Sequence, residues 1–198
     1  MLQLILGGTR SGKSVFAEKQ IKQLETQNPQ ATVSYIATAE LFDQGMKDRA
    51  KQHADRRPQH WQLIEAPLQL TQTLNALNSP DQIILLDCLT LWLNNVIYYQ
   101  SKNSQSKKSQ FKPNHEQNQS DQSNSLSIKK SFDDLLHCLT SHQANIVLVS
   151  NEVGLGILPM DKSTREFADY CGVLNQQLAN IVQKAYLITA GLPITLKG

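Results

Sequence analysis

Long apolar runs are absent from this 198-residue sequence. No stretch reaches the roughly 18 consecutive apolar residues that a membrane-spanning helix requires. The apolar start, residues 1–6, has no basic flank, is shorter than the apolar core of a secretory signal and leads directly into glycines. We therefore expect a soluble, cytoplasmic protein with no membrane span.

Cysteine and net charge are also scarce. The three cysteines are odd in number, widely spaced and embedded in apolar sequence, which favours buried thiols over a disulfide framework or a zinc site. The net charge is only +2, and the lysines and arginines are scattered apart from short pairs. Because a nucleic-acid groove needs a basic stripe, this pattern disfavours nucleic acid as a partner.

Short apolar runs alternate with longer amphipathic stretches, which is typical of βαβ units and a largely parallel sheet. We expect strands at residues 2–6, 32–37, 61–65, 82–87, 145–150 and 185–190, with a short edge strand at 194–196. We expect helices at residues 13–27, 41–54, 67–78, 88–99, 126–143 and 163–184. The length and the 40% hydrophobic content suit one α/β domain over residues 1–198, with helices on both faces of a mostly parallel central sheet.

One segment breaks this alternation. Gln, Ser and Asn make up 17 of the 26 residues from Gln100 to Ser125, and Phe111 is the only large apolar side chain among them. Such a segment buries too little apolar surface to offset the entropy lost on ordering. We predict a disordered surface insertion at about residues 100–125, with a partner-binding segment as the alternative.

A phosphate-binding motif follows the first predicted strand. Gly7, four further residues and then Gly12-Lys13-Ser14 match the P-loop pattern, and a helical pattern begins at Lys13. In this motif the backbone N–H groups and the helix N-terminus bind phosphates, the lysine reaches the outer phosphates and the serine hydroxyl ligates Mg²⁺. Lys13 is thus a predicted catalytic residue in a P-loop NTPase fold of the RecA-like type. The predicted nucleotide-binding residues of the loop are Gly7, Gly8, Thr9, Arg10, Ser11, Gly12, Lys13 and Ser14.

The apolar run at residues 83–86 ends on Asp87. This form is typical of the strand whose aspartate holds Mg²⁺, directly or through water, in P-loop enzymes. On its own, an aspartate at the end of a buried strand is more often a loop starter or a helix cap. With the P-loop upstream, we expect Ser14 and Asp87 to hold Mg²⁺ beside a bound nucleotide.

A histidine and three arginines gather around the end of the second predicted helix. Spacings of four from Arg49 to His53 and of three from His53 to Arg56 put these side chains on one face if the helix continues that far, and Arg57 follows. An imidazole flanked by guanidiniums suits attack on a phosphoryl group, because the arginines stabilise the developing negative charge. Spacing alone fits a surface histidine with charged neighbours at least as well, so both interpretations stay open at this point.

Seven ordered sequence blocks cover almost the whole chain. They are Leu6-Gly-Gly-Thr-Arg-Ser-Gly-Lys-Ser14, Tyr35-Ile-Ala-Thr38, Met46-x-x-Arg-x-x-x-His53 with Arg56-Arg57-Pro58, Leu86-Asp-Cys-Leu-Thr-Leu-Trp-Leu93, Ser150-Asn-Glu-Val-Gly-Leu-Gly-Ile157, Arg165-x-Phe-x-Asp169 and Gly172-x-x-Asn-Gln176. Together they resemble the bifunctional adenosylcobinamide kinase/adenosylcobinamide-phosphate guanylyltransferase family of cobalamin biosynthesis. The polar insertion departs from the pattern of that family.

The resemblance implies a chemistry of two steps. A nucleoside triphosphate, ATP or GTP, phosphorylates the aminopropanol hydroxyl of adenosylcobinamide. GMP from GTP then passes through a guanylylated histidine to adenosylcobinamide phosphate, which gives adenosylcobinamide-GDP. The nucleotidyl histidine maps to His53, and the family suggests a homo-oligomer, specifically a trimer. The GTP-binding segments map to Gly7 through Ser14 and to Ala37, Thr38, Ala39, Ala54, Asp55, Arg56, Arg57, Glu65 and Asp87.

Five polar or glycine positions fall at the carboxyl ends of predicted strands. They are Gly7, Thr38, Glu65, Asp87 and Asn151. Because ligands bind at the carboxyl ends of strands in open α/β sheets, we expect these positions to meet in one crevice.

Other interpretations stay open on the sequence. A simple P-loop small-molecule kinase would need no nucleophilic histidine, and an ATP-driven nucleic-acid motor would share the same sheet. Glu152 fits a substrate- or metal-orienting group and a loop cap equally well. Asp169, Asn175 and Gln176 are candidate site residues through the resemblance alone.

Overall fold

The computed structural model describes residues 1–40, 43–108, 117–157 and 159–198, and in this part the side chains of Arg49 and of residues 103–124 are left undescribed. Within these ranges one seven-stranded sheet has the order β3-β2-β4-β5-β1-β6-β7. The strands are β1 (Leu2–Gly7), β2 (Thr32–Ala37), β3 (Gln62–Glu65), β4 (Gln82–Asp87), β5 (Asn145–Val149), β6 (Lys184–Thr189) and β7 (Leu192–Lys197). Neighbouring strands pair in parallel, except for the antiparallel hairpin of β6 and β7.

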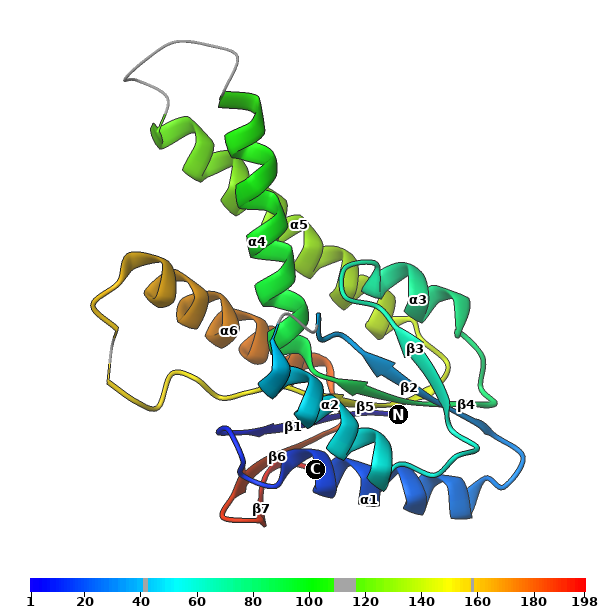
Figure 1. The fold of residues 1–198 in the computed structure, drawn as a ribbon. Helices are drawn as coiled ribbons and strands as arrows, with labels where there is room; N and C mark the ends of the chain where they lie inside the picture. The colour runs from blue at the N-terminus through cyan, green and yellow to red at the C-terminus, as the bar shows by residue number, and fades with distance from the viewer. Residues whose placement is uncertain (41–42, 109–116, 158) are drawn as a thin grey trace.

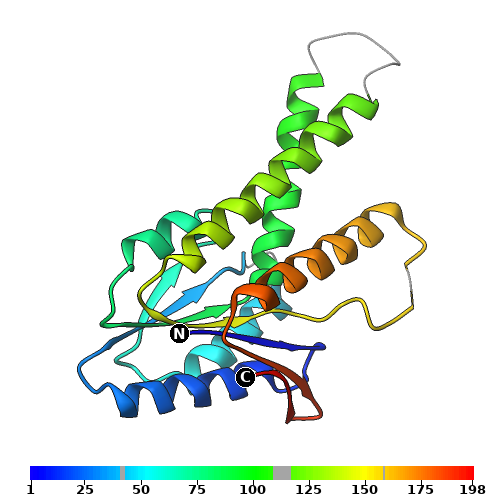
Figure 2. The ribbon, with the colours of Figure 1, turned by 180° about the vertical axis from the view of Figure 1, so that it is seen from behind.

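Helices cover both faces of the sheet, with α1 and α2 on one face and α3 to α6 on the other (Figures 1 and 2). The helices are α1 (Lys13–Gln27), α2 (Gln44–Arg56), α3 (Leu70–Ala76), α4 (Leu89–Lys108), α5 (Gln117–Thr140) and α6 (Lys162–Ile181). The outer parts of α4 and α5 form an arm that projects away from the sheet. None of the helices described has both the length and the apolar composition to span a bilayer.

Two apolar cores result from this layering, because successive strand side chains point to opposite faces of the sheet. On one face, Ile21 of α1 packs with Ile83 of β4. On the other face, Leu93 and Phe132, from α4 and α5, belong to the core that contains Ile84. Each such fully buried side chain stabilises the fold by about 1.5–3 kcal/mol relative to exposure. None of the described side chains of α2 is buried, so this helix is held mainly through its polar contacts.

The predicted strands are confirmed to within a residue or two, and the predicted edge strand at 194–196 extends to the whole of β7. The α/β fold with a mostly parallel sheet is confirmed. Strand β5 lies between the P-loop strand β1 and the Asp87 strand β4, which is the arrangement typical of RecA-like P-loop domains. The three cysteines are buried and free, as the sequence suggested.

The predicted helix ends differ most around the polar segment. Helix α4 continues to Lys108 instead of ending near residue 99, and α5 begins at Gln117 instead of residue 126. The apolar periodicity that sets a predicted helix end stops at these positions, whereas polar residues such as Gln and Lys support a helix without it. Residues 109–116 of the predicted insertion lie outside the described part. The disorder of the insertion stays a prediction.

Smaller differences have local causes. Helix α2 begins at Gln44 because Asp43 caps it, with its Oδ1 accepting a hydrogen bond from Met46 N at 2.8 Å. Residues 41–42 of the predicted helix lie outside the described part. Helix α3 begins at Leu70, three residues after Pro67, and α6 ends at Ile181 because β6 starts at Lys184.

Replacing residues 103–124 with a short Gly/Ser linker should change the free energy of unfolding by less than about 1 kcal/mol, because loop-closure entropy varies only slowly with length. The deletion leaves the cores intact, since Val96 and Ile128 at the base of the arm are retained. Chemical denaturation of both chains measures the effect. A loss of cooperative unfolding in the shortened chain would contradict this prediction.

Candidate active site

The carboxyl ends of the central strands meet at one edge of the sheet. Ala37 pairs with both Glu65 and Asp87, and Asp87 also pairs with Val149. The residues that follow these strands, Thr38 and Asn151, therefore lie at the same edge as the end of β1. This arrangement brings the predicted strand-end positions to one side of the molecule, as expected for an open α/β sheet.

The P-loop forms a cradle at the start of α1. Ser11 N donates a hydrogen bond to Gly8 O at 3.2 Å, and Lys13 Nζ donates to the same oxygen at 2.7 Å. Gly12 is the N-cap of α1, has φ +99° and provides no side-chain cap. The first N–H groups of the helix are thus available for an anion, and the helix dipole favours negative charge there.

Lys13 lies folded back into the cradle and is only 8% exposed. Burial lowers the pKa of Lys13, while the neighbouring Cys88 and Asp87 act in the opposite direction. A partly desolvated ammonium group close to Asp87 suits an interaction with incoming phosphate oxygens.

The hairpin between β6 and β7 supports the cradle from behind. Gly191 N donates a hydrogen bond to Ser11 O at 2.8 Å. A Cβ atom on Gly12 would lie 3.1 Å from Gly191 Cα, so the two backbones pack at close range. The hairpin fixes the shape of the loop even though its own residues come from the far end of the chain.

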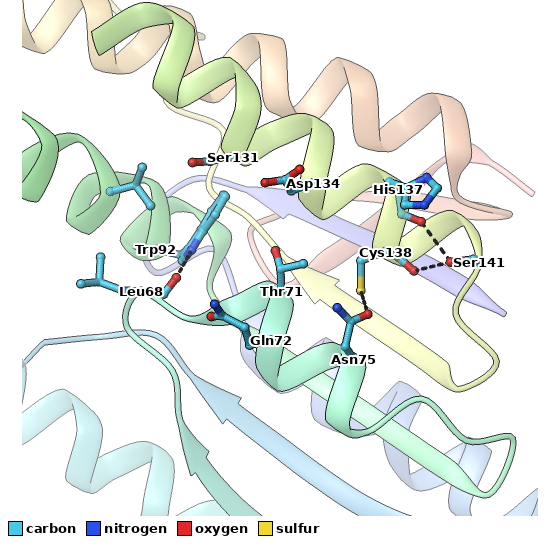
Figure 3. Close-up of a pocket in the computed structure, with 11 residues that line it drawn as sticks. Leu68, Thr71, Gln72, Asn75, Trp92, Ser131, Asp134, His137, Cys138 and Ser141 are labelled. Carbon is cyan, nitrogen blue, oxygen red and sulfur yellow. Dashed lines mark hydrogen bonds between the residues drawn. The ribbon is translucent and has the colours of Figure 1, made fainter. Parts of the chain in front are cut away.

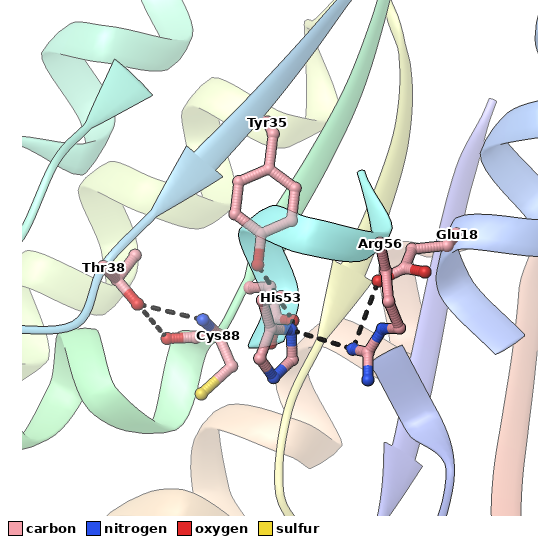
Figure 4. Close-up of polar contacts among 7 residues, drawn as sticks. Glu18, Tyr35, Thr38, His53, Arg56 and Cys88 are labelled. Carbon is pink, nitrogen blue, oxygen red and sulfur yellow. Dashed lines mark hydrogen bonds and ion pairs between the residues drawn. The ribbon is translucent and has the colours of Figure 1, made fainter. Parts of the chain in front are cut away.

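Tyr35, His53 and Arg56 come together at this edge (Figure 4), and Tyr35 and His53 both lie next to Asp87. Tyr35 donates its hydroxyl to Asp87 Oδ2 at 3.2 Å, and His53 Nδ1 lies 3.6 Å from the same oxygen. Burial and the nearby Asp87 raise the pKa of Tyr35, so the phenol keeps its proton and remains a donor. Burial, followed by Asp87, also raises the pKa of the Cys88 thiol to about 12, which makes this cysteine a poor nucleophile.

His53 reaches this edge from the last turn of α2. Its Nδ1 lies 3.3 Å from Arg56 Nη2, and that guanidinium nitrogen is 3.4 Å from Glu18 Oε1 on α1. Because the described contacts of the ring involve Nδ1, Nε2 is the nitrogen that is left to meet a phosphoryl group. The guanidinium of Arg57 lies over the ring of Tyr35, 4.7 Å from its centroid. The side chain of Arg49 lies outside the described part.

Thr38 uses its side chain within the protein. Its hydroxyl donates to Cys88 O at 2.6 Å and accepts from Cys88 N at 2.9 Å, and Asn95 Nδ2 donates to Thr38 O at 2.9 Å. These buried bonds join the end of β2 to the end of β4 and to α4. The hydroxyl of Thr38 is therefore already used within the protein. Its predicted contact with nucleotide rests on the position of the residue at this edge of the sheet.

Some predicted residues lie apart from these contacts. Ala54 and Asp55 are exposed on α2, and Glu65 is exposed at the end of β3. Within the described residues no hydrogen bond or ion pair joins Asp55 or Glu65 to the cradle. Their assignment to the nucleotide site stays a prediction.

Two residues were missed by the sequence reasoning as individual contributors. Glu18 is buried and holds Arg56, and Tyr35 holds Asp87. A signal existed for Glu18, because it lies four residues after Ser14 and so on the same helical face. The alternation of the strand likewise puts Tyr35 on the face of Ala37, two residues ahead.

A second hollow, of about 630 Å³, lies on the opposite face of the sheet between α3, α4 and α5 (Figure 3). Its polar groups largely bind one another: Trp92 Nε1 donates to Leu68 O at 3.3 Å, and Cys138 Sγ lies 3.2 Å from Asn75 Oδ1. None of the predicted site residues lines it. The carboxyl edge of the sheet, where the cradle and Asp87 lie, is therefore the candidate active site.

Comparisons with known proteins agree on one family. The family profile described as cobinamide kinase / cobinamide phosphate guanyltransferase matches residues 3–196. A protein of Pseudomonas aeruginosa, named bifunctional adenosylcobalamin biosynthesis protein CobP, is 38% identical over 198 residues and aligns over 100% of this chain and 98% of its own length. Two proteins named bifunctional adenosylcobalamin biosynthesis protein CobU align over 100% of both chains, at 30% identity in Escherichia coli and 33% in Salmonella typhimurium.

The first two glycines of the cradle should differ in how well they tolerate a side chain. Gly7 has φ +153°, and a Cβ there would lie 2.5 Å from Ile188 O, whereas nothing lies within 4 Å of a Cβ on Gly8. Gly7→Ala should lower the free energy of unfolding by about 2 kcal/mol, and Gly8→Ala by less than about 0.5 kcal/mol. Thermal unfolding of the two variants makes the comparison, and equal stabilities would show that the close approach at Gly7 is absent in solution.

Proposed function

Since this chain belongs to the cobinamide kinase / cobinamide phosphate guanyltransferase family, we propose that the carboxyl edge around Asp87 carries both of its reactions. The protein is a bifunctional enzyme of adenosylcobalamin biosynthesis, with cobinamide kinase and cobinamide phosphate guanylyltransferase activities. The proposal concerns which residues perform each step. The observation that carries it is the 3.6 Å distance between His53 Nδ1 and Asp87 Oδ2, at the strand end beside the P-loop.

In the kinase step the cradle of residues 7–14 binds the phosphates of ATP or GTP through its backbone N–H groups and the N-terminus of α1. The aminopropanol oxygen of adenosylcobinamide attacks the γ-phosphorus and gives up its proton to solvent, the bond from that phosphorus to the β-phosphate oxygen breaks, and the nucleoside diphosphate leaves with the electron pair. Lys13 stabilises the negative charge on the transferred group, since its ammonium lies in the cradle. Positioning and charge stabilisation account for most of the catalysis in such transfers.

The oxygen donors of Ser14 and Asp87 suit Mg²⁺. A hydroxyl and a carboxylate are the hard ligands that this ion prefers, and it commonly takes only one or two protein ligands with substrate phosphates. In the described residues no group of three or more His, Cys, Asp or Glu could hold a metal ion, so nucleotide phosphates would supply much of the coordination. When bound, the ion neutralises charge on the phosphates.

In the guanylyl step the Nε2 lone pair of His53 attacks the α-phosphorus of GTP. A phosphorus–nitrogen bond forms, the bond to the β-phosphate oxygen breaks, and pyrophosphate leaves with the electron pair. Asp87 favours the tautomer with the proton on Nδ1, which leaves the lone pair on Nε2, and Arg56 lies beside the ring. A phosphate oxygen of adenosylcobinamide phosphate then attacks the same phosphorus, and His53 recovers its lone pair.

Arg56 stabilises the charge that develops on the α-phosphate, because its guanidinium lies beside the His53 ring. A simple P-loop kinase would need neither this histidine nor its arginine, which is why the arrangement favours the bifunctional scheme. We further propose that the enzyme works in the cytoplasm as a homo-oligomer. The resemblance to the family favours a trimer.

The histidine assignment predicts a selective defect. His53→Ala should abolish labelling of the protein by GTP and lower guanylyl transfer by at least about 10³-fold, because no nucleophile replaces the imidazole. Cobinamide phosphorylation should persist, since Lys13, Ser14 and Asp87 are unchanged. The measurements are mass analysis of the protein after incubation with GTP and Mg²⁺, and separate assays of the two activities.

His60→Ala serves as the matched control, because His60 is an exposed histidine paired with Glu25 at 2.6 Å. This variant should label normally. The adduct on the unaltered chain should survive alkali and break down in mild acid, as a phosphorus–nitrogen bond does. A GMP adduct that persists in His53→Ala, or that maps to Lys13, would overturn the assignment.

A further inference from the structure

The loop between β5 and α6 exposes large apolar side chains beside the candidate active site. Leu155 is 80% exposed, Ile157 98% and Met160 96%. Residues 153–160 contain no charged side chain. Several apolar side chains crowded into so short a stretch of surface are more typical of a contact site than of ordinary solvent-exposed surface.

Both ends of this loop are attached to the body of the protein. At its start, Glu152 N donates a hydrogen bond to Gly7 O at 3.0 Å, which ties the loop to the first residue of the cradle. At its end, Arg165 Nη1 of α6 donates to Pro159 O at 2.9 Å and to Met160 O. Between these attachments the loop projects beyond the edge of the sheet (Figures 1 and 2).

A buried polar group with an unused acceptor lies at the root of the loop. Asn175 of α6 is 5% exposed, and its Nδ2 donates to Asn151 O at 3.1 Å. Its Oδ1 is buried and has no hydrogen-bond partner among the described residues. Because buried polar atoms are nearly always paired, this acceptor is a hydrogen-bonding group that the described residues leave unused.

The groups around Asn175 are already committed within the protein. Thr90 Oγ1 accepts from Asn151 N at 2.6 Å, and the Glu152 carboxylate accepts from Gly154 N at 2.8 Å. Glu152 also lies close enough to Cys171, one helical turn before Asn175, to raise the pKa of that thiol, although burial is the larger cause. The root of the loop is therefore a fixed polar floor next to the cradle.

We propose that this loop docks the cobinamide acceptor, with Leu155, Ile157 and Met160 against a face of the corrin ring and Asn175 Oδ1 accepting a hydrogen bond from its amide-bearing arm. The inference rests on the proposed function, because it takes the acceptor from that assignment. A corrinoid is a wide macrocycle with apolar faces and a fringe of amides. The uncharged apolar loop matches the apolar faces of the macrocycle, and the polar floor at its root matches the amides.

The root of the loop also lies where the acceptor must meet the phosphate that is transferred. The attachment of Glu152 to Gly7 puts the root of the loop beside the phosphate cradle, so an arm bound at Asn175 could extend toward the transferred group. The loop offers the phosphates of the nucleotide no positive charge, because residues 153–160 contain no charged side chain. The loop should thus determine acceptor affinity alone.

The test uses Ile157→Ser, with Leu126→Ser as its matched control. Leu126 is also an exposed apolar side chain, at 67%, but lies on α5 in the arm. Ile157→Ser should raise the KM for adenosylcobinamide and for adenosylcobinamide phosphate about tenfold, the ratio expected for one lost apolar contact. The KM for GTP and the yield of GMP adduct in the absence of acceptor should not change, and Leu126→Ser should leave every value unchanged.

A second variant, Asn175→Leu, removes the orphaned acceptor at similar volume and should raise the same two KM values with normal adduct formation. Adduct formation without acceptor reports on the proposed function separately, so its failure in the unaltered chain would point to that assignment and not to the loop. An unchanged acceptor KM in Ile157→Ser would overturn the docking proposal. Conversion of an oligomer to monomers by Ile157→Ser, seen in sedimentation, would also overturn it and assign the loop to contacts between copies of this chain.

Discussion

The carboxylate of Asp87 is surrounded by groups from three other elements. Tyr35 of β2 donates a hydrogen bond to it, and His53 of α2 lies beside it. The charge of Asp87 also acts to raise the pKa of Lys13 of α1, against the larger effect of burial. These partners offset the free energy that it costs to remove the charge of Asp87 from water at the end of the strand. Helix α2 buries none of its described side chains, and it reaches the sheet through the contacts of His53 with Asp87 and of Arg56 with Glu18.

In the proposed scheme one carboxylate serves both reactions in two different ways: it would hold Mg²⁺ in phosphoryl transfer, and it positions His53 in guanylyl transfer. Phosphoryl transfer requires negative charge to be neutralised at the γ-phosphate, and guanylyl transfer requires a histidine that is held in place at the α-phosphate. A P-loop fixes the triphosphate along the start of α1. In the proposed scheme the carboxyl edge of the parallel sheet supplies the carboxylate of Asp87, and the end of α2 supplies the nucleophile His53.

The sequence predicts the sheet well because parallel strands are continuous apolar runs that end in polar or glycine residues. The sequence also predicts the P-loop, because the function of this motif follows from local backbone geometry. By contrast, the nearness of His53 to Asp87 follows only from the resemblance to a family. Contacts between distant elements, such as Glu18 with Arg56, leave no local pattern. The length of α4 and α5 was missed for another reason, since polar residues support helices without periodicity.

In the two proposals, the loop after β5 binds the acceptor and the residues around Asp87 perform the chemistry. If Asp87 is the shared element, removing only its charge must damage both activities. The direct measurement is the initial rate of cobinamide phosphorylation and of GMP transfer in Asp87→Asn, which keeps the shape of the side chain. The account predicts that both rates fall by at least about 100-fold, the usual loss when one preorganised electrostatic group is removed. Full retention of either rate would show that the two reactions do not share this carboxylate.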